Sequence, residues 1–120
     1  MGTTDDTTEE VLDRHLEAFG AQDMDAILAD YDEDAVVVAQ LETYRGLDEI
    51  EELFAGLFEE FDDPDVTFSL DESLVEDEYG HIVWRASTPE TEYEFATDTF
   101  VIRDGNIVAQ TFVAKTSDAA

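Results

Sequence analysis

Residues 93–114 read YEFATDTFVIRDGNIVAQTFVA, which is two apolar, β-branched runs on either side of an Asp-Gly pair. Asp104-Gly105 between two such runs is a strong signal for a hairpin, because both central residues of a tight hairpin turn need a left-handed backbone conformation. The sequence therefore predicts two long antiparallel strands, over about 93–102 and 106–114.

Shorter strand signals lie upstream of this hairpin. Residues 66–70 alternate apolar and polar side chains, and residues 81–87 follow a turn that contains Gly80. Residues 35–39 form a β-branched run, Ala-Val-Val-Val-Ala, and residues 42–45 form a short extended piece. These patterns are typical of strands. Two of them lie in the first half of the chain, and the part of the chain from residue 66 onward is expected to be almost entirely β-sheet.

Three helices are expected in the first half of the chain. Thr7 and Glu10 have the spacing of a capping box at a helix start. Asp23 can cap a second, short helix whose inward residues end at Tyr31. Residues 48–61 carry an apolar stripe at helical spacing, and we interpret the carboxylates on their other side as a solvated helix face.

This order of elements indicates the α+β class, with three N-terminal helices packed on one face of a curved antiparallel sheet. Aromatic residues make up 11% and hydrophobic residues 43% of the 120 residues, which favours a packed core over a disordered acidic chain. A single domain over residues 1–120 is expected, with frayed ends at about 1–6 and 116–120.

The charge of the chain is extreme. There are 33 Asp and Glu residues against 5 Lys and Arg residues, which gives a formal net charge of −28. So large a charge repels itself at ordinary ionic strength, whereas salt screens the repulsion. The sequence therefore predicts a halophile-adapted protein with an acidic surface, working in the cytoplasm of a salt-loaded cell.

Composition also excludes several classes of function. An acidic chain does not suit nucleic acid or an anionic membrane surface, so neither is expected as a partner. The absence of cysteine excludes disulfides and thiolate chemistry. No stretch has the pattern of a signal peptide or a membrane span, which is consistent with the cytoplasmic location.

Several segments, in order, resemble one known family. They are residues 19–27 (FGAQDMDAI), residues 31–38, Tyr44-Arg45-Gly46, Asp98-Thr99-Phe100 and residues 103–108. Their order and spacing resemble the SnoaL-like branch of the nuclear transport factor 2-like superfamily, the ketosteroid isomerase-like fold. The resemblance implies a cone-shaped α+β domain over nearly the whole chain. It does not imply one function, because this fold hosts isomerases, polyketide cyclases, epoxide hydrolases and binding modules.

Asp98 is the first candidate for a catalytic residue. It lies in phase with Phe100 and Ile102, so it faces the core if they do. Burial in an apolar cavity raises the pKa of a carboxyl toward the range useful for proton transfer. The alternative is that a bulge or the curvature of the sheet turns Asp98 to solvent. In SnoaL-like cyclases a late-strand aspartate moves the proton, and the resemblance implies that role for Asp98.

His15 is the second candidate, on the apolar stripe of the first helix. By resemblance to ketosteroid isomerases, it falls near the position of their pocket tyrosine. A histidine there can donate a hydrogen bond or move a proton near neutral pH. The alternative is a hydrogen-bonded histidine of the core, without a catalytic role.

The sequence departs from two activities of the superfamily. Ala39 or Gln40 stands where ketosteroid isomerases carry their aspartate base, and neither can accept a proton from carbon. Arg85 with Asp98 supplies at most two members of the Asp-Arg-Asp set of the epoxide hydrolases. Arg85 also follows Trp84, so their side chains should point to opposite faces of the strand.

Aromatic residues are expected to line a pocket for a small organic molecule, with simple core packing as the alternative for each. The candidates are Phe19, Tyr31, Tyr44, Phe54, Trp84 and Phe100. No metal is expected, because the two histidines, His15 and His81, lie far apart without spaced acidic partners. No other cofactor is expected.

The expected function is the binding of a small apolar molecule, with cofactor-free isomerase or cyclase chemistry by proton transfer at Asp98 and His15. The alternative is a non-catalytic ligand-binding or assembly module of the same fold. A homodimer through the outer face of the sheet is also predicted. Ile82 and Trp84 on one side of their strand and Val83 on the other leave both faces partly apolar.

Overall fold

The computed structural model describes residues 7–118 of the chain. The helices and strands follow one another in this order: α1 (Thr8–Gly20), α2 (Met24–Ala29), β1 (Tyr31–Ala39), β2 (Glu42–Arg45), α3 (Gly46–Phe61), β3 (Thr67–Glu76), β4 (Tyr79–Ser87), β5 (Thr91–Arg103) and β6 (Asn106–Asp118). None of the helices within residues 7–118 is long and apolar enough to cross a membrane.

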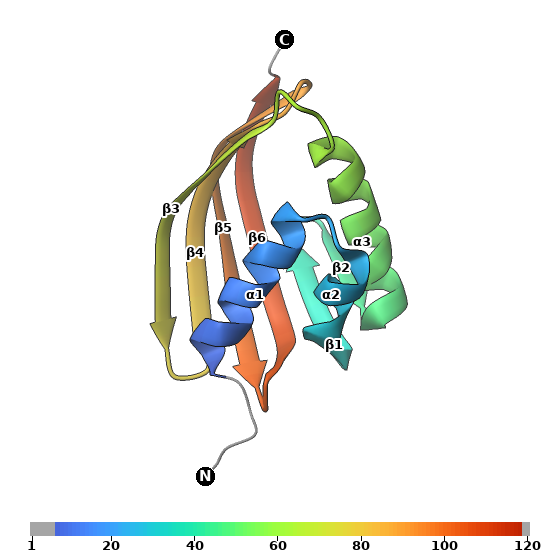
Figure 1. Ribbon diagram of the computed structural model, residues 1–120, viewed down its shortest axis with the longest axis vertical. Helices are drawn as coiled ribbons and strands as arrows, with labels where there is room; N and C mark the ends of the chain where they lie inside the picture. The colour runs from blue at the N-terminus through green and yellow to red at the C-terminus, as the bar shows by residue number, and fades with distance from the viewer. Residues whose placement is uncertain (1–6, 119–120) are drawn as a thin grey trace.

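The six strands form one curved sheet in the order β2-β1-β6-β5-β4-β3, and the helices cover its concave side (Figure 1). This confirms the α+β fold with a curved sheet. The description as three N-terminal helices on an antiparallel sheet is matched only in part. Only α1 and α2 precede the strands, because the β1–β2 pair comes before α3. The sheet is mixed, because β6 enters it beside β1 and runs parallel to it, while the other pairs are antiparallel.

The starts of the first two helices are fixed by their caps. Thr7 and Glu10 form the predicted capping box, and the Asp23 side chain accepts a hydrogen bond from the amide of Ala26. Tyr31, expected at the end of the second helix, is instead the first residue of β1. The chain leaves the helix at Asp30, whose carbonyl accepts a bond from the Ile107 amide at 2.7 Å and so joins β1 to β6.

The β5–β6 hairpin turns at Asp104 and Gly105, which have φ of 53° and 80°. Both central residues are left-handed, as a tight hairpin turn requires. β6 continues to Asp118, so residues 116–118, expected as a frayed tail, pair with β5 instead. The other residues expected to fray, 1–6 and 119–120, lie outside the described part of the chain.

Close packing of α1 on β4 sets the position of the first helix. A Cβ atom built on Gly80 would lie 3.3 Å from Cδ2 of Leu12, so this strand position has little room for a larger side chain. Leu12 is 1% exposed and belongs to the core. The contact holds α1 across the concave side of the sheet, where one turn further on His15 is also buried.

Candidate functional site

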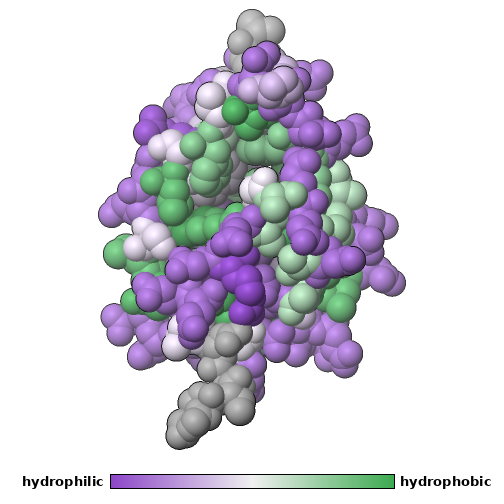
Figure 2. All heavy atoms as spheres, viewed as in Figure 1, coloured by the Kyte–Doolittle hydropathy of each residue, from purple (hydrophilic) through white to green (hydrophobic). Residues whose placement is uncertain are grey.

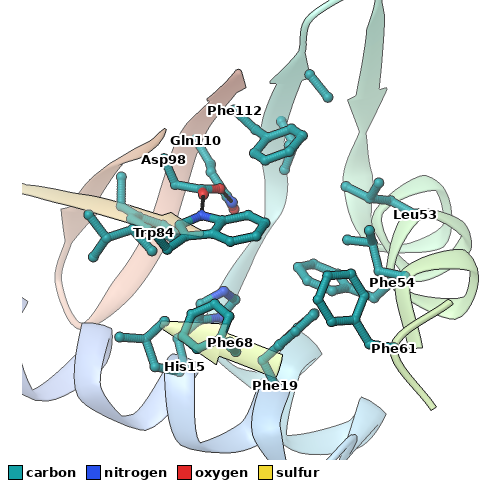
Figure 3. A pocket seen from close by; sticks show the side chains of 16 residues that line it. His15, Phe19, Leu53, Phe54, Phe61, Phe68, Trp84, Asp98, Gln110 and Phe112 are labelled. Carbon is teal, nitrogen blue, oxygen red and sulfur yellow. Dashed lines mark hydrogen bonds between the residues drawn. The ribbon is translucent and has the colours of Figure 1, made fainter. Parts of the chain in front are cut away.

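An apolar cavity of about 120 Å³ lies between α1, α3 and the concave side of the sheet (Figure 3). Its wall contains seven aromatic residues: Phe19, Phe54, Phe61, Phe68, Trp84, Phe100 and Phe112. Six aliphatic residues complete the apolar part: Leu16, Val37, Ala39, Leu53, Leu57 and Ile82. Three polar side chains face the same space: His15, Asp98 and Gln110. A pocket with apolar walls and a few polar groups is the usual form of a small-molecule site.

A second hollow adjoins the cavity and shares Leu16, Phe19, Phe61 and Phe68 with it. It lies between the end of α1 and the segment 61–68 that joins α3 to β3. Hydrophilic residues cover much of the molecular face in Figure 2, whereas hydrophobic residues gather around the hollowed centre. We interpret the second hollow as the mouth of the cavity.

Asp98 lies on β5 with its side chain turned into the cavity, and it is only 7% exposed. One carboxylate oxygen accepts a hydrogen bond from the Trp84 indole N–H at 2.7 Å, and the other accepts one from the Gln110 amide at 2.8 Å. Burial raises the pKa of Asp98 to about 6, although these two hydrogen bonds and the charge of His81 act in the opposite direction. At neutral pH the carboxyl is therefore mostly ionised but close to its pKa, as suits a general base.

Gln110 connects Asp98 to a buried tyrosine. The Tyr31 hydroxyl donates to Oε1 of Gln110, and Nε2 of Gln110 donates to Asp98. An ionised carboxylate only accepts hydrogen bonds, so it requires the amide nitrogen of Gln110 to face it. The Tyr31 proton then satisfies the amide oxygen. Burial and the charges of Asp98 and Asp30 raise the pKa of Tyr31, which keeps this proton in place.

We expect Tyr31→Phe to raise the pKa of Asp98, by roughly 0.5–1 unit, because the amide that stabilises its ionised form loses its own partner. Trp84 is the single tryptophan of the chain and is bonded to Asp98, so its fluorescence should follow the titration. Tyr44→Phe, far from Asp98 on an edge strand, is the matched control. An unchanged midpoint in Tyr31→Phe would show that Gln110 holds its orientation without the tyrosine.

His15 lies on α1 and is buried among three aromatic rings. The ring centres of Tyr31, Phe54 and Phe100 are 5.6, 5.8 and 5.3 Å from that of His15, all in edge-on contacts. Its Nδ1 atom is buried and has no hydrogen-bond partner among residues 7–118. Burial lowers the pKa of His15 to about 4, so the ring is neutral at physiological pH. It can offer one N–H or one lone pair, but it is not a cation.

The structure places the predicted ligand-binding residues in two groups. Phe19, Phe54, Trp84 and Phe100 line the cavity, as do Asp98 and His15. Tyr31 and Tyr44 do not. Tyr31 lies behind the wall, where its hydroxyl bonds to Gln110. Tyr44 is on the edge strand β2, beyond β1 and away from β4 and β5, and its hydroxyl lies beside Glu42.

The structure also places the residues at which the sequence departs from the ketosteroid isomerases and the epoxide hydrolases. Ala39 lines the cavity. An alanine, which cannot accept a proton, therefore stands at the position that the resemblance aligns with the aspartate base of ketosteroid isomerases. Gln40 is exposed, and its side chain bonds to the carbonyl of Ala114. Arg85 is exposed and forms an ion pair with Asp71, which agrees with its predicted direction away from Trp84. His81 is half-buried beside Thr99.

Besides the aliphatic residues of the wall, four aromatic or polar wall residues were not predicted: Gln110, Phe61, Phe68 and Phe112. Phe61 could have been predicted as a wall residue from the sequence, because it belongs to the apolar stripe of α3. Phe112 stacks on Trp84 with ring centres 6.0 Å apart. Across residues 7–118, no group of three or more His, Asp or Glu side chains is placed to hold a metal ion.

A curved mixed sheet whose concave side is closed by helices around an apolar hollow defines the class of cone-shaped domains known as nuclear transport factor 2-like. Within that class the chain belongs to the SnoaL-like domain family, whose model matches residues 12–110. No curated protein has a sequence that matches the chain.

Three solved structures illustrate the likeness. A proposed polyketide cyclase from Sinorhizobium meliloti is 19% identical, with a TM-score of 0.73 over 86% of this chain and 93% of that chain. A proposed ketosteroid isomerase from Kribbella flavida is 12% identical, with a TM-score of 0.76 over 94% and 82%. An NTF2-like protein of unknown function from Burkholderia xenovorans is 21% identical, with a TM-score of 0.74 over 90% and 82%. At such identities the likeness shows the fold alone.

Proposed function

We propose that this protein binds a small apolar molecule in the cavity and that Asp98 accepts a proton from it, in a cofactor-free isomerase or cyclase reaction. The observation that carries the proposal is the buried Asp98 carboxylate, held by Trp84 and Gln110 in an otherwise apolar wall. Its pKa of about 6 suits a base at neutral pH. His15, neutral and facing the same cavity, is the proposed donor to an oxygen of the ligand. The names of two structural neighbours, a polyketide cyclase and a ketosteroid isomerase, are consistent with this chemistry.

A non-catalytic ligand-binding or assembly module is the second candidate. The observation that favours it is Ala39, which faces the cavity without a group that can accept a proton. In this case Asp98 would anchor the ligand through a hydrogen bond and no bond would be made or broken.

A ligand screen followed by isotope exchange separates the two candidates. Hydrophobic metabolites, neutral and charged, are tested for binding by thermal shift in about molar salt, where charges on the protein surface are screened. Each hit is then incubated with the protein in D₂O. Deuterium incorporation that Asp98→Asn abolishes supports catalysis, whereas binding without incorporation supports the module.

Filling part of the cavity should weaken the binding of such hits. Ala39→Leu adds a side chain to the wall without changing charge, and we expect at least a tenfold loss of affinity because the added atoms take the place of the ligand. Leu41→Ala, at a side chain that is 97% exposed, is the control. Hits that bind Ala39→Leu as tightly as the unchanged protein would show that they occupy another place.

We also propose that the protein is a cytoplasmic, salt-adapted homodimer. The pairing register aligns Leu74, His81, Thr99, Thr111 and Val38 in one row across the convex side of the sheet. The row contains no carboxylate, in a chain with 33 acidic residues. An uncharged, partly apolar row in the middle of the convex side of so acidic a protein favours burial against a second copy.

A charge placed on this convex face should dissociate the dimer. Val113 is 55% exposed in the next row, beside Thr97 and two strands away from Val83, and this row ends at Glu72 on β3. We expect the unchanged protein to scatter light as twice 13.4 kDa and Val113→Lys to scatter as a monomer, because an unpaired charge is costly to bury. Leu41→Lys is the control for added charge. A monomer in the unchanged protein would refute the dimer.

A further inference from the structure

The charge inside the cavity is not balanced. Asp98 is ionised above about pH 6, yet the two groups bonded to it, an indole N–H and an amide N–H, are neutral. Neither Lys nor Arg lines the cavity or its mouth in the described part of the chain. The other titratable groups near Asp98 are His15 and Tyr31 on the concave side and His81 through the sheet. His15 and Tyr31 are neutral at physiological pH.

The route to Asp98 carries the same sign of charge. Asp62 and Asp63 lie in the wall of the mouth, between the end of α3 and β3. An anionic ligand would therefore pass two carboxylates and meet a third at the end of the cavity. A cation would be attracted at each step, because a cleft lined by one sign of charge concentrates ligands of the opposite sign.

The walls suit an organic cation better than a bare metal ion. Rings of Phe61, Phe68 and Phe112 surround the Trp84 indole, with ring centres 5.5–6.5 Å from it. Aromatic faces attract ammonium groups, and the attraction grows when the pair is shielded from water. The volume of about 120 Å³ is similar to the roughly 150 Å³ cavity that holds one benzene ring in another protein.

We propose that the natural occupant of the cavity is an organic cation, a protonated amine or quaternary ammonium on a compact apolar body, whose charge pairs with Asp98. This inference rests on the ligand-binding function proposed above and narrows its ligand class. A buried carboxylate is costly without a counter-charge, and here the counter-charge arrives with the ligand. The bonds from Trp84 and Gln110 leave the second lone pair of each carboxylate oxygen available to the ligand.

The test compares three molecules of the same shape and different charge: benzylamine, benzyl alcohol and benzoate. Binding is measured by Trp84 fluorescence and by calorimetry in about molar salt at about pH 7.5, where Asp98 is ionised and the surface charge is screened. We expect benzylamine to bind at least tenfold more tightly than benzyl alcohol, and benzoate not to bind. Asp98→Asn should remove the preference for benzylamine while keeping the affinity for benzyl alcohol. Asp13→Asn, which removes one exposed charge of α1, should keep the preference.

A second measurement needs no substitution. At about pH 5 Asp98 is protonated while benzylamine stays cationic, so the preference should fall to near unity. Equal binding of benzylamine and benzyl alcohol at about pH 7.5, or tighter binding of benzoate, would overturn the cation proposal and leave the ligand-binding function standing. Failure of all three to bind would overturn both.

Discussion

Asp98→Asn is expected to stabilise the protein at about pH 8 and to abolish any proton transfer that it catalyses. The substitution keeps the shape of the side chain and removes its ionisation. The side-chain amide of Gln110 can flip, so that its oxygen accepts a hydrogen bond from the amide nitrogen of the introduced asparagine and its nitrogen donates to the Tyr31 hydroxyl. Since burial raises the pKa of Asp98 from its usual value to about 6, a shift of about two units at about 1.4 kcal/mol each, we expect a gain of about 3 kcal/mol in the free energy of unfolding.

The sign of this effect depends on pH. Burial favours the protonated form, so Asp98 lowers stability above its folded pKa of about 6. The penalty vanishes as the pH falls toward about 4, the pKa of aspartate in the unfolded chain. Chemical unfolding of both proteins should therefore show a difference at about pH 8 that closes near about pH 4, with Asp13→Asn showing no such pattern. A less stable Asp98→Asn at about pH 8 would mean that the bonds from Trp84 and Gln110 outweigh the cost of burying the charge.

Removal of salt is expected to unfold the protein. The net charge of −28 acts over distances that shrink from about 30 Å at 0.01 M salt to about 3 Å at 1 M. Dilution therefore restores the repulsion among carboxylates that the folded state brings together. Circular dichroism through a salt titration should show native structure in about molar salt and its loss near about 0.05 M.

A variant with fewer charges provides the control for this salt effect. Asp13, Glu17, Glu51 and Glu59 are exposed on α1 and α3. Their replacement by the corresponding amides should move the transition to lower salt by relieving repulsion, without touching the cavity. Full stability of the unchanged protein at low salt would contradict the proposed salt adaptation.

The alternation of side chains along a strand predicts that Asp98 can face the core, but it does not predict the inward position of Gln110. No extra residue interrupts β5 between Asp98 and Ile102, so Asp98 shares the inward side of Phe100, as alternation predicts. On β6, however, Val108 is an extra residue, because Ile102 pairs with Ile107 while Val101 pairs with Ala109. This bulge shifts the alternation by one residue and turns Gln110 inward. Nothing local in the sequence marks it.

Long-range pairing explains the other differences from the sequence prediction. The turn, the helix caps and the apolar stripe of α3 depend on neighbouring residues, and they could be predicted. The position of Tyr44 could not be predicted, because it depends on which strand forms the edge of the sheet. That strand is β2. Tyr31 left the helical pattern because Asp30 is tied to Ile107, which is 77 residues away in the sequence.

The most direct test of the account is a carbon-13 NMR titration of the Asp98 carboxyl in about molar salt, assigned with Asp98→Asn, in the absence and presence of benzyl alcohol. The account predicts a midpoint near pH 6 that moves when benzyl alcohol fills the cavity beside the carboxyl. A midpoint near about pH 4, as for an exposed aspartate, that benzyl alcohol leaves in place would contradict it.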